Sequence, residues 1–98
     1  MRLIYHPEAE AELIEAACFY EEQVKSLGEE FLDAVDLATN QICKNPERWR
    51  VLDAGVRRYL MQRFPYSLYS LIQPDQIQIL TVKHHSRHPD HWRDRISK

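Results

Sequence analysis

Apolar positions divide the first half of the chain into two helical stripes. Apolar side chains recur every three or four residues through residues 8–26 and again through residues 29–44, the spacing of one helical face. Pro7 suits a first helical turn, and Gly28 breaks the pattern between the stripes. This predicts an antiparallel pair of amphipathic helices with almost no loop between them. The predicted buried stripes are Leu13, Ala17, Tyr20, Val24 and Leu27, then Phe31, Val35, Ala38 and Ile42.

The second half of the chain changes to residue types that favour strands. Three runs, residues 56–64, 66–72 and 77–85, are rich in β-branched and aromatic side chains and are separated by turn residues. Residues 2–5 form a shorter strand candidate that should join the same sheet. The predicted order is therefore β-α-α-β-β-β, an α+β fold with a helical hairpin packed on a small antiparallel sheet. The expected core residues are Phe31, Val35, Ile42, Leu68, Ile79 and Val82.

Length and composition indicate one ordinary globular domain over residues 1–98. A chain of 98 residues has room for a single core, and its 44% hydrophobic and 29% charged content is typical of globular proteins. No apolar run approaches the roughly 20 residues of a membrane span, and the N-terminus turns acidic before a signal-peptide core develops. We expect a cytoplasmic protein. Cys18 and Cys43 would lie roughly 7 Å apart along the helical hairpin, so reduced thiols are expected.

Charge divides the chain at the same boundary as the secondary structure. Residues 1–45 carry ten acidic and three basic side chains, whereas residues 46–98 carry five acidic and ten basic ones. The formal net charge of −2 therefore conceals a dipolar molecule. Arginine suits bidentate capture of phosphate and carboxylate, which indicates a polyanion or an acidic protein as partner. The alternative interpretation is a solvated, charged sheet face.

The segment VKHHSRHPDHWRDR, residues 82–95, raises the question of a metal site. His84, His88 and His91 have helical spacing, but Pro89 interrupts any helix through them. No cysteine or carboxylate completes an obvious tetrahedral set. We therefore expect no metal and no other cofactor.

Metal-free RNA cleavage is a better match to the residue types of this segment. Such a reaction needs a proton acceptor, a proton donor and cations that stabilise the phosphorane. The candidate acid and base groups are His84, His85 and His88, and the candidate phosphate-binding groups are Arg57, Arg58, Arg63, Lys83 and Arg87. Glu12 and Glu15 read as solvated charges of an acidic helix. Trp49 and Trp92 are either stacking platforms for bases or anchors against the core or a partner.

Several stretches together resemble one known family. The opening YHPEAEAEL, the helix ending ICKNP, the hairpin VRRYLMQRFPYSLYSLI and the segment VKHHSRHPDHWRDR follow its pattern in order and spacing. Over its whole length the chain is similar to the RelE/ParE toxin superfamily, the toxins of type II toxin-antitoxin pairs, often labelled plasmid stabilisation proteins. The resemblance implies the RelE/ParE-like β-α-α-β-β-β fold. It also implies a growth inhibitor that a cognate antitoxin neutralises in a hetero-oligomer.

The target that the resemblance implies depends on the branch. Ribonuclease members carry lysines and arginines on the central strands and a tyrosine near the C-terminus, whereas here Ser67 follows Tyr66 where an arginine is common, and Trp92 lies near the tyrosine position. The segment resembles the gyrase-poisoning ParE-like members more closely, so DNA gyrase is the expected target. The implied partner-binding and target-binding residues are Arg57, Arg58, Arg63, Lys83, His84, Arg87, Trp92, Arg93 and Arg95.

Two alternatives stay open. One is a RelE-like, ribosome-dependent mRNA endoribonuclease, in which histidines replace the missing groups. Its candidate catalytic residues are Arg58, Arg63, His84, His85 and Arg87. The other is an inactive toxin relic that only binds its antitoxin.

Overall fold

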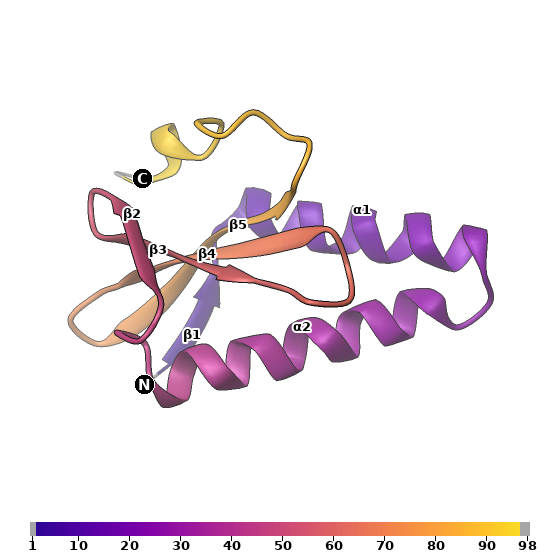
Figure 1. Cartoon of the computed structure of the whole chain (residues 1–98), viewed down its shortest axis with the longest axis horizontal. Helices are drawn as coiled ribbons and strands as arrows, with labels where there is room; N and C mark the ends of the chain where they lie inside the picture. The colour runs from indigo at the N-terminus through magenta and orange to yellow at the C-terminus, as the bar shows by residue number, and fades with distance from the viewer. Residues whose placement is uncertain (1, 97–98) are drawn as a thin grey trace.

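Two helices cover one face of a five-stranded sheet in the computed structural model, which describes residues 2–96 (Figure 1). The sheet order is β1-β5-β4-β3-β2, with β1 parallel to β5 and every other neighbouring pair antiparallel. The elements are β1 (Arg2–Tyr5), α1 (Pro7–Gln23), α2 (Leu27–Lys44), β2 (Arg50–Asp53), β3 (Val56–Leu60), β4 (Tyr66–Ile72), β5 (Gln76–His84) and a 3₁₀ helix, Arg93–Arg95.

The predicted α+β class and the predicted order of helices and long strands are confirmed, but two details of the sheet are wrong. The sheet is mixed rather than antiparallel, because β1 lies parallel to β5. The prediction also missed β2, whose four residues are mostly exposed and so lack an alternating apolar pattern. Periodicity identifies a strand by its buried face, and it carries no information on strand direction.

The turn between the helices differs from the one that the sequence predicted. The left-handed residue is Ser26, with φ of 71°, whereas Gly28 lies inside α2. The Glu21 carboxylate accepts hydrogen bonds from the backbone N–H groups of Ser26 and Gly28, at 2.8 and 3.0 Å, and so caps α2. A Cβ atom at Gly28 would collide with the carbonyl oxygen of Ala17. The glycine is therefore needed for close helix contact and not for ending a helix.

The main core lies between the helical hairpin and the sheet. All six predicted core residues are buried there, which confirms the strand and α2 patterns. The predicted α1 stripe is only partly right: Val24 is exposed, and Ala9 and Ala16 are the buried residues. Leu13, Ala17, Tyr20 and Leu27 are half-buried and pack against this core.

A second, smaller core covers the other face of the sheet. After β5 the chain turns back and runs toward β2 (Figure 1), and we call residues 85–96 the C-terminal strap. Trp92 of the strap packs with Val56, Tyr69 and Leu80 of the sheet, and its ring lies 5.6 Å from that of Tyr69. The strap is thus part of the folded domain.

Candidate functional site

A bulge in β5 exposes backbone groups at the edge of the sheet. Tyr69 pairs with Thr81 and Ser70 pairs with Ile79, so Leu80 has no partner in β4. β1 accompanies β5 only as far as Ile79. The carbonyl of Leu80 and the N–H of Val82 therefore lie beyond the reach of the neighbouring strand and need other partners.

Glu12 of α1 and Arg95 of the strap satisfy these backbone groups. The Arg95 guanidinium donates to the Leu80 carbonyl at 2.9 Å, and the Val82 N–H donates to Glu12 Oε1 at 3.1 Å. The two side chains also bind each other, with Arg95 Nη1 and Nη2 each 3.0 Å from a different Glu12 oxygen. This bidentate ion pair closes the edge of β5 and ties the strap to α1.

Glu12 is the centre of a larger polar network. The Thr81 hydroxyl donates to Glu12 Oε1 at 2.7 Å, His91 Nε2 lies 3.2 Å from Oε2, and Arg87 Nη1 lies 3.7 Å from Oε2. Burial on its own raises the pKa of Glu12, but hydrogen bonds from Arg95 and Thr81, the charge of Arg95 and the Val82 N–H outweigh burial and lower it. The interpretation of Glu12 as a solvated charge is therefore wrong.

Trp92 and Arg95 lie in the interior, although both were predicted to contact a partner. Trp92 is almost fully buried, and its indole N–H donates to the Pro89 carbonyl at 2.6 Å. Only 5% of the Arg95 side chain is exposed. Of the two sequence interpretations of Trp92, the anchor against a core is confirmed. Arg93 is exposed and forms ion pairs with Asp53 and Asp90, which hold the strap near β2.

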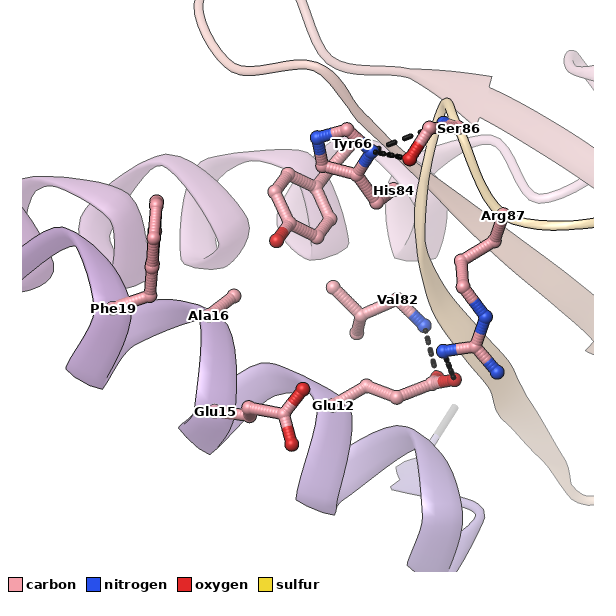
Figure 2. A pocket seen from close by; sticks show the side chains of 9 residues that line it. All are labelled: Glu12, Glu15, Ala16, Phe19, Tyr66, Val82, His84, Ser86 and Arg87. Carbon is pink, nitrogen blue, oxygen red and sulfur yellow. Dashed lines mark hydrogen bonds and ion pairs between the residues drawn. The ribbon is translucent and has the colours of Figure 1, made fainter.

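A groove runs between α1 and the end of β5, with a volume of about 340 Å³ (Figure 2). Its lining combines apolar, acidic and basic side chains: Glu12, Glu15, Ala16, Phe19, Tyr66, Val82, His84, Ser86 and Arg87. The rings of Tyr66 and His84 meet edge to face at 5.0 Å. Ser86 fixes the imidazole, because its backbone N–H donates to His84 Nδ1 at 3.0 Å. Burial raises the pKa of Tyr66, and the nearby Tyr20, Glu15 and Glu12 raise it further.

The predicted ribonuclease residues lie in different places. His84 lines the groove beside α1, whereas Arg58 projects from β3 on the sheet face opposite the helices. His85 Nε2 lies 3.1 Å from the Ser67 hydroxyl, and Arg63 forms an ion pair with Glu30 of α2. The structure thus brings His84 and Arg87 together in one groove, whereas Arg58, Arg63 and His85 have their partners elsewhere.

Arg57 differs from its neighbour Arg58 in orientation. Its guanidinium donates to the carbonyls of Glu47 and Trp49, both at 2.9 Å, on the helix side of β3. This half-buried side chain fastens the segment before β2 to the sheet. On the same side, Trp49 packs against Tyr59 with ring centroids 4.6 Å apart.

Sequence reasoning missed Glu12 and Thr81 as site residues. One signal for Glu12 was present: it stands three residues after Ala9 and four before Ala16, the two buried residues of α1. A carboxylate on a buried helical face needs a cationic partner. No local pattern identifies Arg95 as that partner, because 83 residues separate them.

The structure was also searched for metal-binding clusters and for membrane-spanning helices. Residues 2–96 contain no cluster of three or more histidine, cysteine, aspartate or glutamate side chains arranged to hold a metal ion. Within the same described part of the chain, no helix has the length and apolar character to cross a membrane.

Two of three comparisons with known proteins give a match. The comparison with curated proteins gives none. Among solved structures, a chain of the "Chromosomal ParDE TA system from P. aeruginosa" is 26% identical with a TM-score of 0.66, over 86% of this chain and 95% of that one. The model of the family described as "ParE toxin of type II toxin-antitoxin system, parDE" matches residues 3–89. This chain therefore belongs to the ParE toxin family of type II toxin-antitoxin systems.

Proposed function

We propose that the protein inhibits growth by acting on DNA gyrase and that a cognate antitoxin neutralises it in a cytoplasmic hetero-oligomer. The observation that carries the proposal is the family match over residues 3–89, which includes both helices and all of the sheet except its first residue, Arg2. The solved relative is described as a ParDE toxin-antitoxin system, which supports a protein antitoxin as partner.

The surface supports an antitoxin segment with both apolar and acidic side chains. Phe19 is 54% exposed at the groove beside α1, and Leu37 is 67% exposed at a second groove between α2 and β3. Arg87 lines the first groove and Arg63 the second. A partner helix or strand that places apolar residues in a groove and carboxylates on its rim would complement both.

The gyrase proposal is favoured over the endoribonuclease alternative by the scatter of the candidate catalytic groups. General acid-base cleavage needs both proton-transfer groups within hydrogen-bond reach of one phosphodiester. His84 lies in the groove beside α1, while His85 lies with Ser67 on β4. A toxin that works by binding does not need these groups to converge.

Three assays on the purified protein separate the proposed function from its alternatives. We expect inhibition of supercoiling by purified gyrase, unchanged mRNA in a translating extract, and reversal of the gyrase effect by the cognate antitoxin. Induction in cells, with and without the antitoxin, gives the matching growth phenotype. Cleavage of ribosome-bound mRNA without an effect on gyrase would support the endoribonuclease. Antitoxin binding with neither effect would identify a relic.

A further inference from the structure

Glu15 is an exposed carboxylate that lines the groove beside α1. In the described part of the chain, no cationic side chain lies within ion-pair distance of it. The other carboxylate of the groove, Glu12, binds Arg95 and lies 3.7 Å from Arg87. Glu8, one turn earlier in α1, lies 3.7 Å from Arg95. Three carboxylates thus share two guanidinium groups, which leaves the negative charge of Glu15 without a partner.

Two aromatic rings border the same part of the groove as the Glu15 carboxylate. Phe19 stands four residues after Glu15 and so neighbours it on the helix surface, and 54% of Phe19 is exposed. Tyr66 lies across the groove, with its hydroxyl pointing toward α1 (Figure 2). Burial raises the pKa of Tyr66 most, and the charges of Tyr20, Glu15 and Glu12 raise it further. Because the face of an aromatic ring attracts positive charge, the rings and Glu15 favour the same ligand, a cation.

The rest of the groove favours a cation that is carried by a polypeptide. Ala16 and Val82 add buried apolar surface to the lining, and Arg87 lies at the opposite end from Phe19 (Figure 2). A free small cation would leave the exposed Phe19 ring uncovered and Arg87 without a further anion. A segment with a basic residue beside Glu15, an apolar residue next to it and a carboxylate beside Arg87 would complement the whole groove.

We infer that the antitoxin segment places one basic side chain between Glu15, Phe19 and Tyr66. Arginine suits this position best, because its guanidinium binds a carboxylate through two hydrogen bonds and stacks on aromatic faces. The inference rests on the proposed neutralisation by an antitoxin and adds the chemistry of one anchor. It also restricts the antitoxin carboxylates in this groove to the end that holds Arg87.

The chemistry of the anchor is tested with two capped peptides that differ in one charge. One peptide has an arginine between two leucines, and the other has citrulline, the neutral isostere of arginine, at the same position. Both are titrated into isotope-labelled protein, and the amide chemical shifts report affinity and location. We expect the arginine peptide to shift the signals of Glu15, Phe19 and Tyr66 and to bind about tenfold more tightly than the citrulline peptide.

Variants of α1 assign this preference to the groove. Glu15→Gln keeps the shape and removes the charge, so the preference for arginine should fall to about threefold. Phe19→Leu keeps an apolar side chain without the ring and should weaken the arginine peptide alone. Glu10→Gln is the matched control, because Glu10 is an exposed carboxylate on a different face of α1. An unchanged preference in Glu15→Gln, or an equal loss in Glu10→Gln, would overturn the site.

Two further results of the peptide titration would overturn the inference. One is equal binding, or no binding, of the arginine and citrulline peptides. The other is tighter binding of a third peptide that carries glutamate at the same position, because the groove would then accept an anion. The peptides contain no part of the antitoxin, so their outcome does not depend on whether an antitoxin neutralises this protein.

The source of the basic residue is tested with the antitoxin that restores growth in cells. Calorimetric titration should show about threefold to fivefold weaker antitoxin binding to Glu15→Gln than to Glu10→Gln. Equal binding would exclude the antitoxin as the source and overturn the inference, while neutralisation itself would stand. Self-association of the purified protein that Glu15→Gln abolishes would also overturn it, because a second copy would then supply the basic residue.

Discussion

Glu12 and Arg95 join the first helix to the last described turn of the chain, with two nitrogen-oxygen contacts of 3.0 Å each. The pair also bonds the two backbone groups that the β5 bulge turns to the sheet edge. One ion pair therefore holds three parts of the molecule: α1, β5 and the strap. Its loss should affect the strap before it affects the helical core.

Replacing Glu12 with glutamine should lower the free energy of unfolding by about 3 kcal/mol. The substitution keeps the shape but removes the bidentate counter-ion of the buried Arg95, which leaves only the exposed Glu8 carboxylate, 3.7 Å away. Urea unfolding at neutral pH measures the change. Glu15→Gln is the matched control, because Glu15 is an exposed neighbour on the same helix and should change stability by less than about 0.5 kcal/mol. Equal effects of the two substitutions would contradict the prediction.

The stabilisation from Glu12 should be lost in acid. Its pKa in the folded protein lies below the ordinary value of 4.5, so the carboxylate stabilises the fold fully above that pH. The contribution disappears as the pH falls through the folded-state pKa. The difference in unfolding free energy between wild type and Glu12→Gln should therefore shrink from pH 7 to pH 3. A constant difference over this range would show that the charge of Glu12 is not responsible.

Truncation of Ile79 to alanine should cost about 3 kcal/mol of unfolding free energy. Ile79 is fully buried between β1 and β4, so the substitution leaves a cavity in the main core. Leu37→Ala removes a similar number of atoms from an exposed position and should change stability by less than about 0.5 kcal/mol. Thermal unfolding of both variants gives the comparison. A larger loss from Leu37→Ala would mean that this surface is covered in the purified protein.

Gly28→Ala should destabilise the helical hairpin by about 1 to 3 kcal/mol. The added methyl group meets the Ala17 carbonyl, which belongs to the backbone of α1 and moves only with the helix. In the next position of α2, Glu29→Ala tests the general effect of alanine in this turn and should be nearly neutral. Because alanine is the better helix former, a stabilised Gly28→Ala variant would show that the helices do not approach this closely.

Arg57→Ala should lower the stability of the fold, whereas Arg58→Ala should weaken the binding of a partner. Loss of Arg57 leaves the Glu47 and Trp49 carbonyls without its two hydrogen bonds, so stability should fall by about 1 to 2 kcal/mol. Loss of Arg58 should leave stability almost unchanged and weaken the binding of an anionic partner. Unfolding curves and salt-dependent binding, measured on both variants, separate the two roles. Similar behaviour of the two would contradict the orientations seen in β3.

The pattern of apolar residues correctly predicted the buried faces of α2 and of the long strands. Phe31, Val35, Ile79 and Val82 are buried as expected, because an apolar side chain at helical or strand spacing has one favourable place. Val24 is exposed because α1 ends at Gln23, just before it. β2 escaped prediction for a related reason, since a mostly exposed edge strand has no apolar pattern to detect.

The site was harder to predict because its partners are distant in sequence. Arg95, Trp92 and Lys83 were selected for their charge or size, but residue type does not tell whether an arginine points to solvent or to a buried carboxylate. Glu12 was set aside within an acidic helix for the same reason. Arg95 and Glu12 are needed because the bulge at Leu80 leaves the Leu80 carbonyl and the Val82 N–H without a partner strand. The sequence has no signal for a bulge at this position.

The parallel pairing of β1 with β5 also affects how the protein is made. The strand Arg2–Tyr5 has its hydrogen-bonding partner only at residues 76–79, so it stays unpaired while the intervening chain is synthesised. At about 5 to 20 residues per second, that interval lasts roughly 4 to 15 s. During this time the apolar faces of α1 and α2 have no sheet to cover them. A nascent chain on the ribosome thus lacks the finished surface until residues 80–95 emerge, which gives the cell a delay between the start of translation and the first folded toxin.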